Sequence, residues 1–405
     1  MTNDLRRKRR HRLHRYRVQP RALAMPACVC ALLTLMSIPL EAQSLDLFGG
    51  TGISIGNSRR WNGVRINWRD RGVESVNGIN VTIWEPRENP DFRMNGLAFG
   101  VFGPRAARFN GIALGVGGVI ADERLRGIGI GGLGVVSQGA ITGITLAGLG
   151  AVSQGNLQGF SLAGLGVVSQ GHLQGVSLSG LGVVAQGNLD GISVAGLGAV
   201  AQGHVRGLTI AGLGTVAQGD LTGVSAAGLG LVAQGDLTGI NFGGIAAVAG
   251  QDARWINLAG VAVVAQGDVE GLTLTPGAAV SNESVRGVTL GGLAIVGNQA
   301  VHGLALSLGA VESADHISGI ATGAYRIRAP VFNGASLGIA MNRFHELNGL
   351  AFAAYNEVRT RQRGLTIGIY NRAEELQGVQ IGLLNFAGNN GGIFRWLPLV
   401  NAHFE

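Results

Sequence analysis

The sequence predicts an all-β protein, a Gly-rich β-solenoid of 14–16-residue repeats. From Gly132 to Ser307 the chain divides into eleven consecutive lines of sixteen residues without an insertion, such as GLGAVSQGNLQGFSLA from Gly148. Identical residues recur in fixed columns of these lines, and no apolar period of 3.6 residues is found beyond the first 42 residues. Two short apolar runs per repeat, separated by Gly and Asn or Asp, indicate stacked β units.

In a solenoid each repeat forms one coil, and parallel strand pairing places equivalent residues about 4.8 Å apart. Leu157 belongs to a column that is apolar in most lines, and we expect this column to point into the core. Gly at the corners of the coil would supply the positive φ that turns need. Stacked amides can hydrogen-bond along such a ladder. We expect this of one Gln column, which contains Gln138, Gln154, Gln170, Gln186, Gln202, Gln218, Gln234 and Gln266.

An antiparallel outer-membrane β-barrel is the alternative fold. A segment such as FSLAGLGVVSQ, from Phe160 to Gln170, has the roughly 9–11 residues that a transmembrane strand needs. Identical repeats would build identical turns on both rims, whereas such barrels have short turns on one side and long loops on the other. Both faces of the segment are also apolar or small, which does not suit a water-filled lumen. The solenoid is therefore favoured over the barrel.

Residues 1–42 are predicted to be a signal peptide. A strongly basic stretch is followed by an apolar run and by Ala42, a small residue before a cleavage point, which is the order of a secretory signal. The segment carries nine of the 31 basic and two of the 24 acidic residues, so the remainder has 22 of each. This balance argues against a nucleic-acid partner. Both cysteines, Cys28 and Cys30, lie in the leader, so the rest of the chain forms no disulfide.

The remaining chain is divided into three parts. Residues 43–94 are predicted to be an N-terminal capping region, because terminal repeats of an array are atypical. Residues 95–323 are predicted to be the 16-residue β-repeat array. Residues 324–405 are predicted to contain divergent C-terminal repeats and a cap, and the repeat spacing falls to fifteen between Gly319 and Gly334.

An acidic column is the main candidate for a chemical site. If the coils stack, four carboxylates about 4.8 Å apart would favour a bound cation such as Ca²⁺. The alternative is that Asp is a turn residue at a solvated corner, which the presence of Asn156, His172, Asn188 and His204 in the same column favours. No set of nucleophile, base and acid is found, so the protein is predicted not to be an enzyme and to need no other cofactor. The column contains Asp220, Asp236, Asp252 and Asp268.

Two C-terminal units, GLTIGIYNRAEELQ and GVQIGLLNFAGNN, resemble the tandem NGLQIGLxN-type units of bacterial surface-repeat proteins. The matching pieces are 364–371, 378–385 and 348–356. This resemblance implies a cell-envelope or surface location and no established enzymatic role. The 16-residue period with AGLG is also similar to ice-nucleation repeats, although the chain lacks their Thr-x-Thr rows and stacked Tyr.

These observations predict an exported protein at the cell surface or outer membrane of a Gram-negative-type bacterium. The expected role is structural or adhesive, or based on interaction with an envelope or surface partner. A glycan, a second copy of the chain or a membrane are the partners that such a surface would suit. The alternative is an outer-membrane barrel that acts as a pore or anchor.

Overall fold

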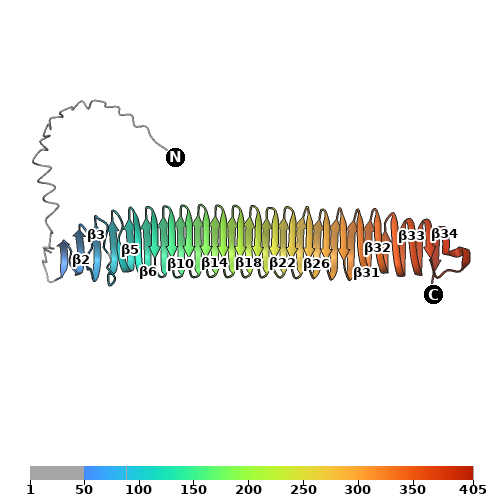
Figure 1. Ribbon diagram of the computed structural model, residues 1–405, viewed down its shortest axis with the longest axis horizontal. Helices are drawn as coiled ribbons and strands as arrows, with labels where there is room; N and C mark the ends of the chain where they lie inside the picture. Colours follow the sequence, from blue (N-terminus) through green and yellow to red (C-terminus); the bar gives the residue numbers. More distant parts are fainter. Residues whose placement is uncertain (1–49, 88, 405) are drawn as a thin grey trace, which may run out of the picture.

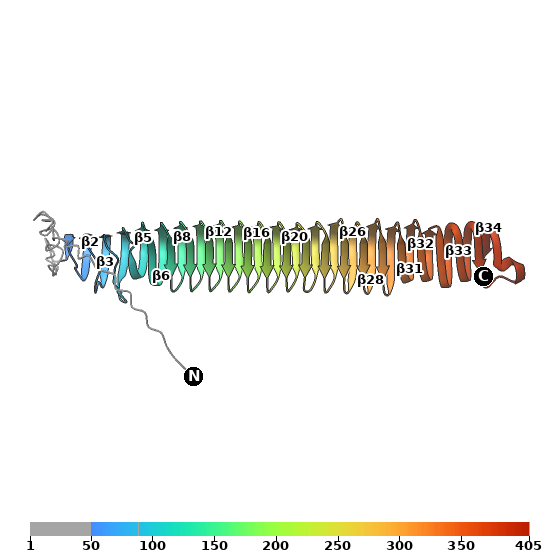
Figure 2. The same ribbon diagram turned by 45° about the horizontal axis from the view of Figure 1, so that its top comes forward.

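The computed structural model describes residues 50–87 and 89–404. The predicted signal peptide and the start of the predicted capping region therefore lie outside the described residues. The described part is a long straight rod of stacked β coils (Figure 1, Figure 2). Apart from one short 3-10 helix, every element within these ranges is a strand.

The coils of the array each contain a long and a short strand joined by two tight turns. The long strands are β8 (Ile141–Ala147), β10 (Leu157–Ala163), β12 (Leu173–Ser179), β14 (Leu189–Ala195), β16 (Val205–Ala211), β18 (Leu221–Ala227), β20 (Leu237–Gly243), β22 (Ala253–Ala259), β24 (Val269–Thr275), β26 (Ser284–Gly291), β28 (Ala300–Ser307) and β30 (His316–Gly323). The short strands are β7 (Gly134–Ser137), β9 (Gly150–Ser153), β11 (Gly166–Ser169), β13 (Gly182–Ala185), β15 (Gly198–Ala201), β17 (Gly214–Ala217), β19 (Gly230–Ala233), β21 (Ala246–Ala249), β23 (Ala262–Ala265), β25 (Ala278–Ser281), β27 (Ala294–Gly297) and β29 (Ala310–Ser313).

Less regular coils flank the array at both ends. Those before it are β1 (Thr51–Ile55), β2 (Arg60–Asn67), β3 (Ser75–Thr82), β4 (Arg93–Gly100), β5 (Arg105–Gly115) and β6 (Gly118–Gly131). Those after it are β31 (Arg326–Gly338), β32 (Met341–Phe352), β33 (Tyr355–Ala387), the 3-10 helix η1 (Gly392–Arg395) and β34 (Trp396–His403).

Strands of the same type pair in parallel between successive coils. The register is sixteen residues in the array, where Leu157 pairs with Leu173 and Gly166 with Gly182. It falls to fifteen at the pair Gly319 and Gly334, as the sequence predicts. The predicted β-solenoid is confirmed. The barrel alternative is wrong, because consecutive strands of such a barrel run antiparallel.

The core lies between the two ladders and consists mainly of small side chains. Alternate residues point inward, and the Leu157 column is buried as predicted, at 1% exposure for Leu157. Ser161, Ala163 and Val167 are buried in the same coil. Buried Ser169 uses its hydroxyl to donate a hydrogen bond to the backbone oxygen of Gly155, at 2.8 Å. Leu157 is the large side chain that points inward in this coil, whereas Leu149 and Leu162 lie on the outside.

A ladder of glycines runs along the long strands. One glycine per coil has φ between +97° and +148°, from Gly52 to Gly378, with a single replacement. A Cβ on Gly159 would lie 2.1 Å from the backbone oxygen of Gly143, which no side chain tolerates. The corner glycines Gly148 and Gly150 do not have positive φ. The expectation of positive φ at the corners is therefore wrong, because the left-handed residue lies within the strand.

Trp255 is the residue that replaces glycine in this ladder. It pairs with Gly239 and Gly271, has φ of +83° and is 67% exposed. A left-handed conformation costs a non-glycine residue about 1–2 kcal/mol. We predict that Trp255→Gly raises the free energy of unfolding by roughly 0.5–1 kcal/mol. The relief of the left-handed strain exceeds the stability that glycine loses through the greater entropy of the unfolded chain. Urea unfolding followed by circular dichroism measures this. Trp255→Ala, which keeps a Cβ at this position, is the control. If Trp255→Gly and Trp255→Ala change the free energy of unfolding equally, the backbone at Trp255 is not strained.

The two ends of the solenoid differ from the array in their polar ladders and pairing. Buried Asn342, Asn356, Asn371 and Asn385 form a chain of amide hydrogen bonds of 2.8–2.9 Å inside the C-terminal coils. The last three are the Asn residues of the units that resemble surface repeats. After them, β34 pairs antiparallel with β33 and so covers the edge of the final coil. β34 also contains Pro398, which lacks a backbone N–H for a further strand.

Candidate functional site

The surface of the array is divided between two edges. We define the apolar edge as the four rows, repeated every sixteen residues, that contain Phe160, Leu162, Leu165 and Val168. Leu165 lies in the turn between the long and the short strand, so these rows wrap around that turn. We define the polar edge as the rows at the opposite turn that contain Gln170, Gly171, His172 and Gln174.

The apolar edge is unbroken by charge over eleven coils. The Val168 row is valine at all eleven positions from Val136 to Val296. The rows of Phe160 and Leu162 are apolar in every coil. The apolar side chains of the turn row are 46–71% exposed. This row contains Leu133, Leu149, Leu165, Leu181, Leu197, Leu213, Leu229, Ile245, Val261, Gly277 and Leu293. Where Gly277 interrupts it, an apolar groove of about 520 Å³ opens beside Leu258, Leu274 and Leu290.

Aromatic residues continue the apolar edge at both ends of the rod. Trp68 stacks on Trp84 with ring centroids 5.8 Å apart, and Trp84 contacts Phe102 at 4.7 Å. The backbone oxygen of Phe102 accepts a hydrogen bond from Gly118, which pairs with Gly134, the residue after Leu133. At the other end, the N–H of Tyr325 donates to the oxygen of Gly309, the position that follows Leu293 in the turn row.

All charged residues of the eleven sixteen-residue lines lie on the polar edge. Between residues 132 and 307 these are Asp190, Arg206, Asp220, Asp236, Asp252, Arg254, Asp268, Glu270, Glu283 and Arg286. Seven are acidic and three are basic, so this edge carries a net negative charge. The array is therefore an amphipathic rod, with its charge on one side and its large apolar side chains on the other.

The predicted acidic column does stack along the polar edge. The N–H of Asp236 donates to Oδ1 of Asp220 at 3.0 Å, and that of Asp252 donates to Oδ1 of Asp236 at 3.1 Å. Asp268 continues the series with an N–H bond to Oδ1 of Asp252 at 2.7 Å. His204 acts in the same way, since its Nδ1 accepts the N–H of Asp220 at 3.0 Å. Each side chain thus caps a backbone N–H in the next coil, which explains why Asn, His and Asp interchange here.

The second oxygens of Asp236, Asp252 and Asp268 contact arginines, and that of Asp220 lies 3.1 Å from Nδ1 of His204. Arg254 bridges Asp236 and Asp252, and its nitrogen lies 3.1 Å from Asp236 Oδ2. Arg286 bridges Asp268 at 2.8 Å and Glu270 at 3.0 Å. In the part of the chain that the structure describes, no group of three or more His, Cys, Asp or Glu is arranged to hold a metal ion. Ca²⁺ binding by the column stays a prediction, and the contacts favour the alternative of a turn cap.

Two other polar features involve histidine and glutamine. The rings of His302 and His316 meet edge to face at 4.8 Å on the polar edge. Burial, and next the charge of His316, lower the pKa of His302 below its usual 6.5, so His302 is neutral at pH 7. The expected Gln ladder is not seen between residues 138 and 234. In that column the amide bonds run from Asn282 to Gln266 and from Asn298 to Asn282.

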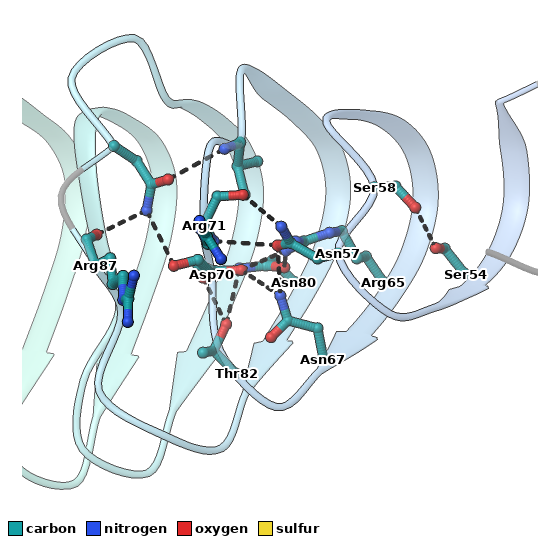
Figure 3. A network of polar contacts seen from close by, with 12 residues as sticks. Ser54, Asn57, Ser58, Arg65, Asn67, Asp70, Arg71, Asn80, Thr82 and Arg87 are labelled. Atoms are coloured by element: carbon teal, nitrogen blue, oxygen red, sulfur yellow. Dashed lines mark hydrogen bonds and ion pairs between the residues drawn. The ribbon is translucent and has the colours of Figure 1, made fainter. Parts of the chain in front are cut away.

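A buried polar network that the sequence analysis did not identify fills the first coils (Figure 3). Arg65 and Asp70 are fully buried and their side chains contact at 2.5 Å. Arg65 also donates to Oδ1 of Asn80 at 2.6 Å, and Thr82 donates to Oδ2 of Asp70 at 2.6 Å. Asn67 donates to Oδ1 of Asp70 at 2.8 Å. Arg65 and Asn80 occupy the interior position that Ser161 holds in the array, and Asn67 and Thr82 that of Ala163, so the network is structural.

Comparison with protein-family models, curated proteins and solved structures finds no match to this chain. The fold itself defines the class, a Gly-rich parallel β-solenoid repeat protein. Among residues 50–87 and 89–404 there is no helix with the length and apolarity to cross a membrane.

Proposed function

We propose that this chain is an exported, non-enzymatic protein of a Gram-negative-type cell envelope that lies along a membrane surface with its apolar edge in the lipid. The observation that carries the proposal is the apolar edge, four rows over eleven coils without a charge. The predicted leader and the surface-repeat resemblance of the C-terminal units support export and an envelope location. The rival function of a pore requires a barrel, and the described residues form a solenoid.

The size of the apolar edge requires a partner. The apolar side chains of its turn row are 46–71% exposed and those of the rows of Phe160 and Val168 at most 45%, so its apolar surface is larger than the about 300–600 Å² of the largest patch on a typical soluble monomer. Removing only about 1,000 Å² from water would contribute about 25 kcal/mol. That exceeds the 4–15 kcal/mol that association costs.

The shape of the apolar edge favours lipid over a second copy. Its rows lie on both sides of a turn, so the edge is a convex ridge. A rigid partner can cover one side of a ridge, whereas a fluid lipid phase encloses both. The rows of Leu162 and Val168 lie three residues from Leu165, or about 10 Å, and the row of Phe160 lies two residues further along the long strand. Interfacial elements insert about 5–10 Å.

The aromatic residues and Trp255 fit the same orientation. Trp and Tyr favour the boundary between lipid and water. Trp68, Trp84 and Tyr325 continue the apolar edge, and Trp255 adjoins the row of Ile256 on the side of the polar edge. In this orientation the acidic polar edge faces water.

Vesicle flotation tests the proposal. We expect the protein to float with phosphatidylcholine vesicles, and Leu181→Glu/Leu197→Glu/Leu213→Glu to reduce the bound fraction at least about tenfold, because each charge costs several kcal/mol in lipid. These leucines are 46–47% exposed and lie outside the core.

The matched control is Gln186→Glu/Gln202→Glu/Gln218→Glu, which adds the same charges to the same coils on the polar edge. It should float like the wild type. Equal flotation of both variants would overturn the proposal. A wild type that ignores vesicles but dimerises through the apolar edge would overturn it in favour of self-association.

A further inference from the structure

A second binding feature lies on the short-strand side of the C-terminal coils. The charged and titratable residues that line a pocket of about 360 Å³ are three arginines, a histidine and a glutamate, which are Arg328, Arg343, Arg359, His345 and Glu312. This volume lies within the range of small-ligand sites, roughly 300–1,000 Å³. The pocket begins where the Val168 row ends, since the next position after Val296 is Glu312.

The charges of this pocket are not balanced in pairs. Successive coils place Glu312, Arg328, Arg343 and Glu357 in one column. Two arginines are thus direct neighbours, and like charges at this spacing repel. The carboxylate of Glu357 forms ion pairs with both Arg343, at 2.8 Å, and Arg359, at 3.3 Å. Glu312 contacts Arg326 rather than Arg328.

Arg328 therefore has no hydrogen-bond or ion-pair partner within the described residues, and it is exposed. Between residues 132 and 307, by comparison, Arg206, Arg254 and Arg286 all contact carboxylates. An anion held between Arg328 and Arg343 would remove the repulsion between them.

The backbone of the pocket is locally rebuilt. The register of β32 against β33 shifts between Phe344 and Glu346, where Arg359 and Thr360 of β33 lie opposite the single residue His345. In the preceding coil Pro330, which lacks a backbone N–H, also lines the pocket. Bulges turn a side chain out of the regular alternation and are frequent beside binding sites. Here Arg359 lies in the bulge and lines the pocket with Arg328, Arg343 and His345.

We propose that this pocket binds a phosphate-type anion, with Arg328 and Arg343 as its principal contacts and His345 at its rim. Guanidinium groups present a planar fork that matches phosphate oxygens in two parallel hydrogen bonds. The phosphate belongs either to a lipid headgroup or to a free phosphorylated compound, and both offer the same chemistry. Binding of free phosphate does not depend on the proposed contact with lipid.

Isothermal titration of the full chain with inorganic phosphate tests this inference. We expect saturable binding that Arg328→Gln weakens at least about tenfold, because a charge-assisted pair is lost. Arg328→Lys keeps the charge but not the planar fork of the guanidinium. Its affinity for phosphate should lie between those of the wild type and Arg328→Gln. Arg286→Gln on the polar edge is the control and should leave the affinity unchanged. No saturable binding, or equal losses in Arg328→Gln and Arg286→Gln, would refute the site.

Vesicles with and without phosphatidic acid distinguish the two sources. If the headgroup is the ligand, phosphatidic acid strengthens flotation, Arg328→Gln removes that gain and inorganic phosphate competes. If a free compound is the ligand, phosphate binds in the titration and flotation is the same with both vesicles.

Discussion

Gly175→Ala should destabilise the array by about 2–5 kcal/mol, the sum of a left-handed strain of about 1–2 and an overpacking cost of about 1–3 kcal/mol. Gly175 has φ of +114°, and a Cβ there would lie 2.2 Å from the backbone oxygen of Gly159. Neither atom can move without breaking the parallel ladder on both sides. Urea unfolding followed by circular dichroism, with hydrogen exchange at β10 and β12, measures the effect.

Gly166→Ala is the matched control for this prediction. Gly166 begins the short strand β11, just before β12 in the chain, and has no positive φ. The nearest neighbour to a Cβ added there is the oxygen of Gly182 at 3.5 Å. Alanine should be tolerated there within about 0.5 kcal/mol, as at other permissive sites. If Gly175→Ala and Gly166→Ala lose stability equally, the positive-φ ladder is no more sensitive to an added side chain than the other glycines, and the prediction is wrong.

Asp70→Ala should cost about 3–5 kcal/mol, because it leaves the guanidinium of Arg65 buried without its counter-charge. Both side chains are 0% exposed, and Asp70 also accepts hydrogen bonds from Asn67, Asn80 and Thr82. Protection from hydrogen exchange should be lost in β2 and β3 while the array keeps it, since each coil of a solenoid contacts only its neighbours.

Glu74→Ala is the control for the buried pair. Glu74 pairs with Arg60 at 2.6 Å in the same coils, but Arg60 is 79% exposed. Exposed pairs contribute about 0–1 kcal/mol. A loss of protection in Glu74→Ala as large as in Asp70→Ala would mean that the N-terminal coils depend on no specific buried network.

The strict period made most of the fold predictable from the sequence. A constant spacing of sixteen residues fixes a register in which like stacks on like, and the Leu157 column is buried as that register requires. The place of the left-handed glycine was not predictable in the same way, because each repeat has several glycines and the period does not say which has positive φ. Trp255 marks the position, since it is the ladder residue that is not glycine.

The candidate sites were predicted less completely. The Asp column stacks as expected, but its role as a turn cap depends on the direction of each carboxylate, which column identity does not reveal. Arg65 and Asp70 stand in a charged stretch that gives no sign of burial. The apolar edge could have been found in the sequence, because the rows of Leu165 and Val168 contain no charge. The sequence shows apolar residues on both faces of the segment from Phe160 to Gln170, but it does not show that the exposed ones surround one turn.

The orientation of the rod on a membrane is the central claim, and depth-dependent fluorescence quenching tests it most directly. Cys28 and Cys30 are the chain's cysteines, so with both replaced a single Cys at Leu197 or at Gln202 carries a fluorophore to the apolar or to the polar edge of one coil. With vesicles of bromine-labelled lipid, we expect strong quenching at position 197 and little at position 202. Equal quenching at both positions, or none at 197, would contradict the account.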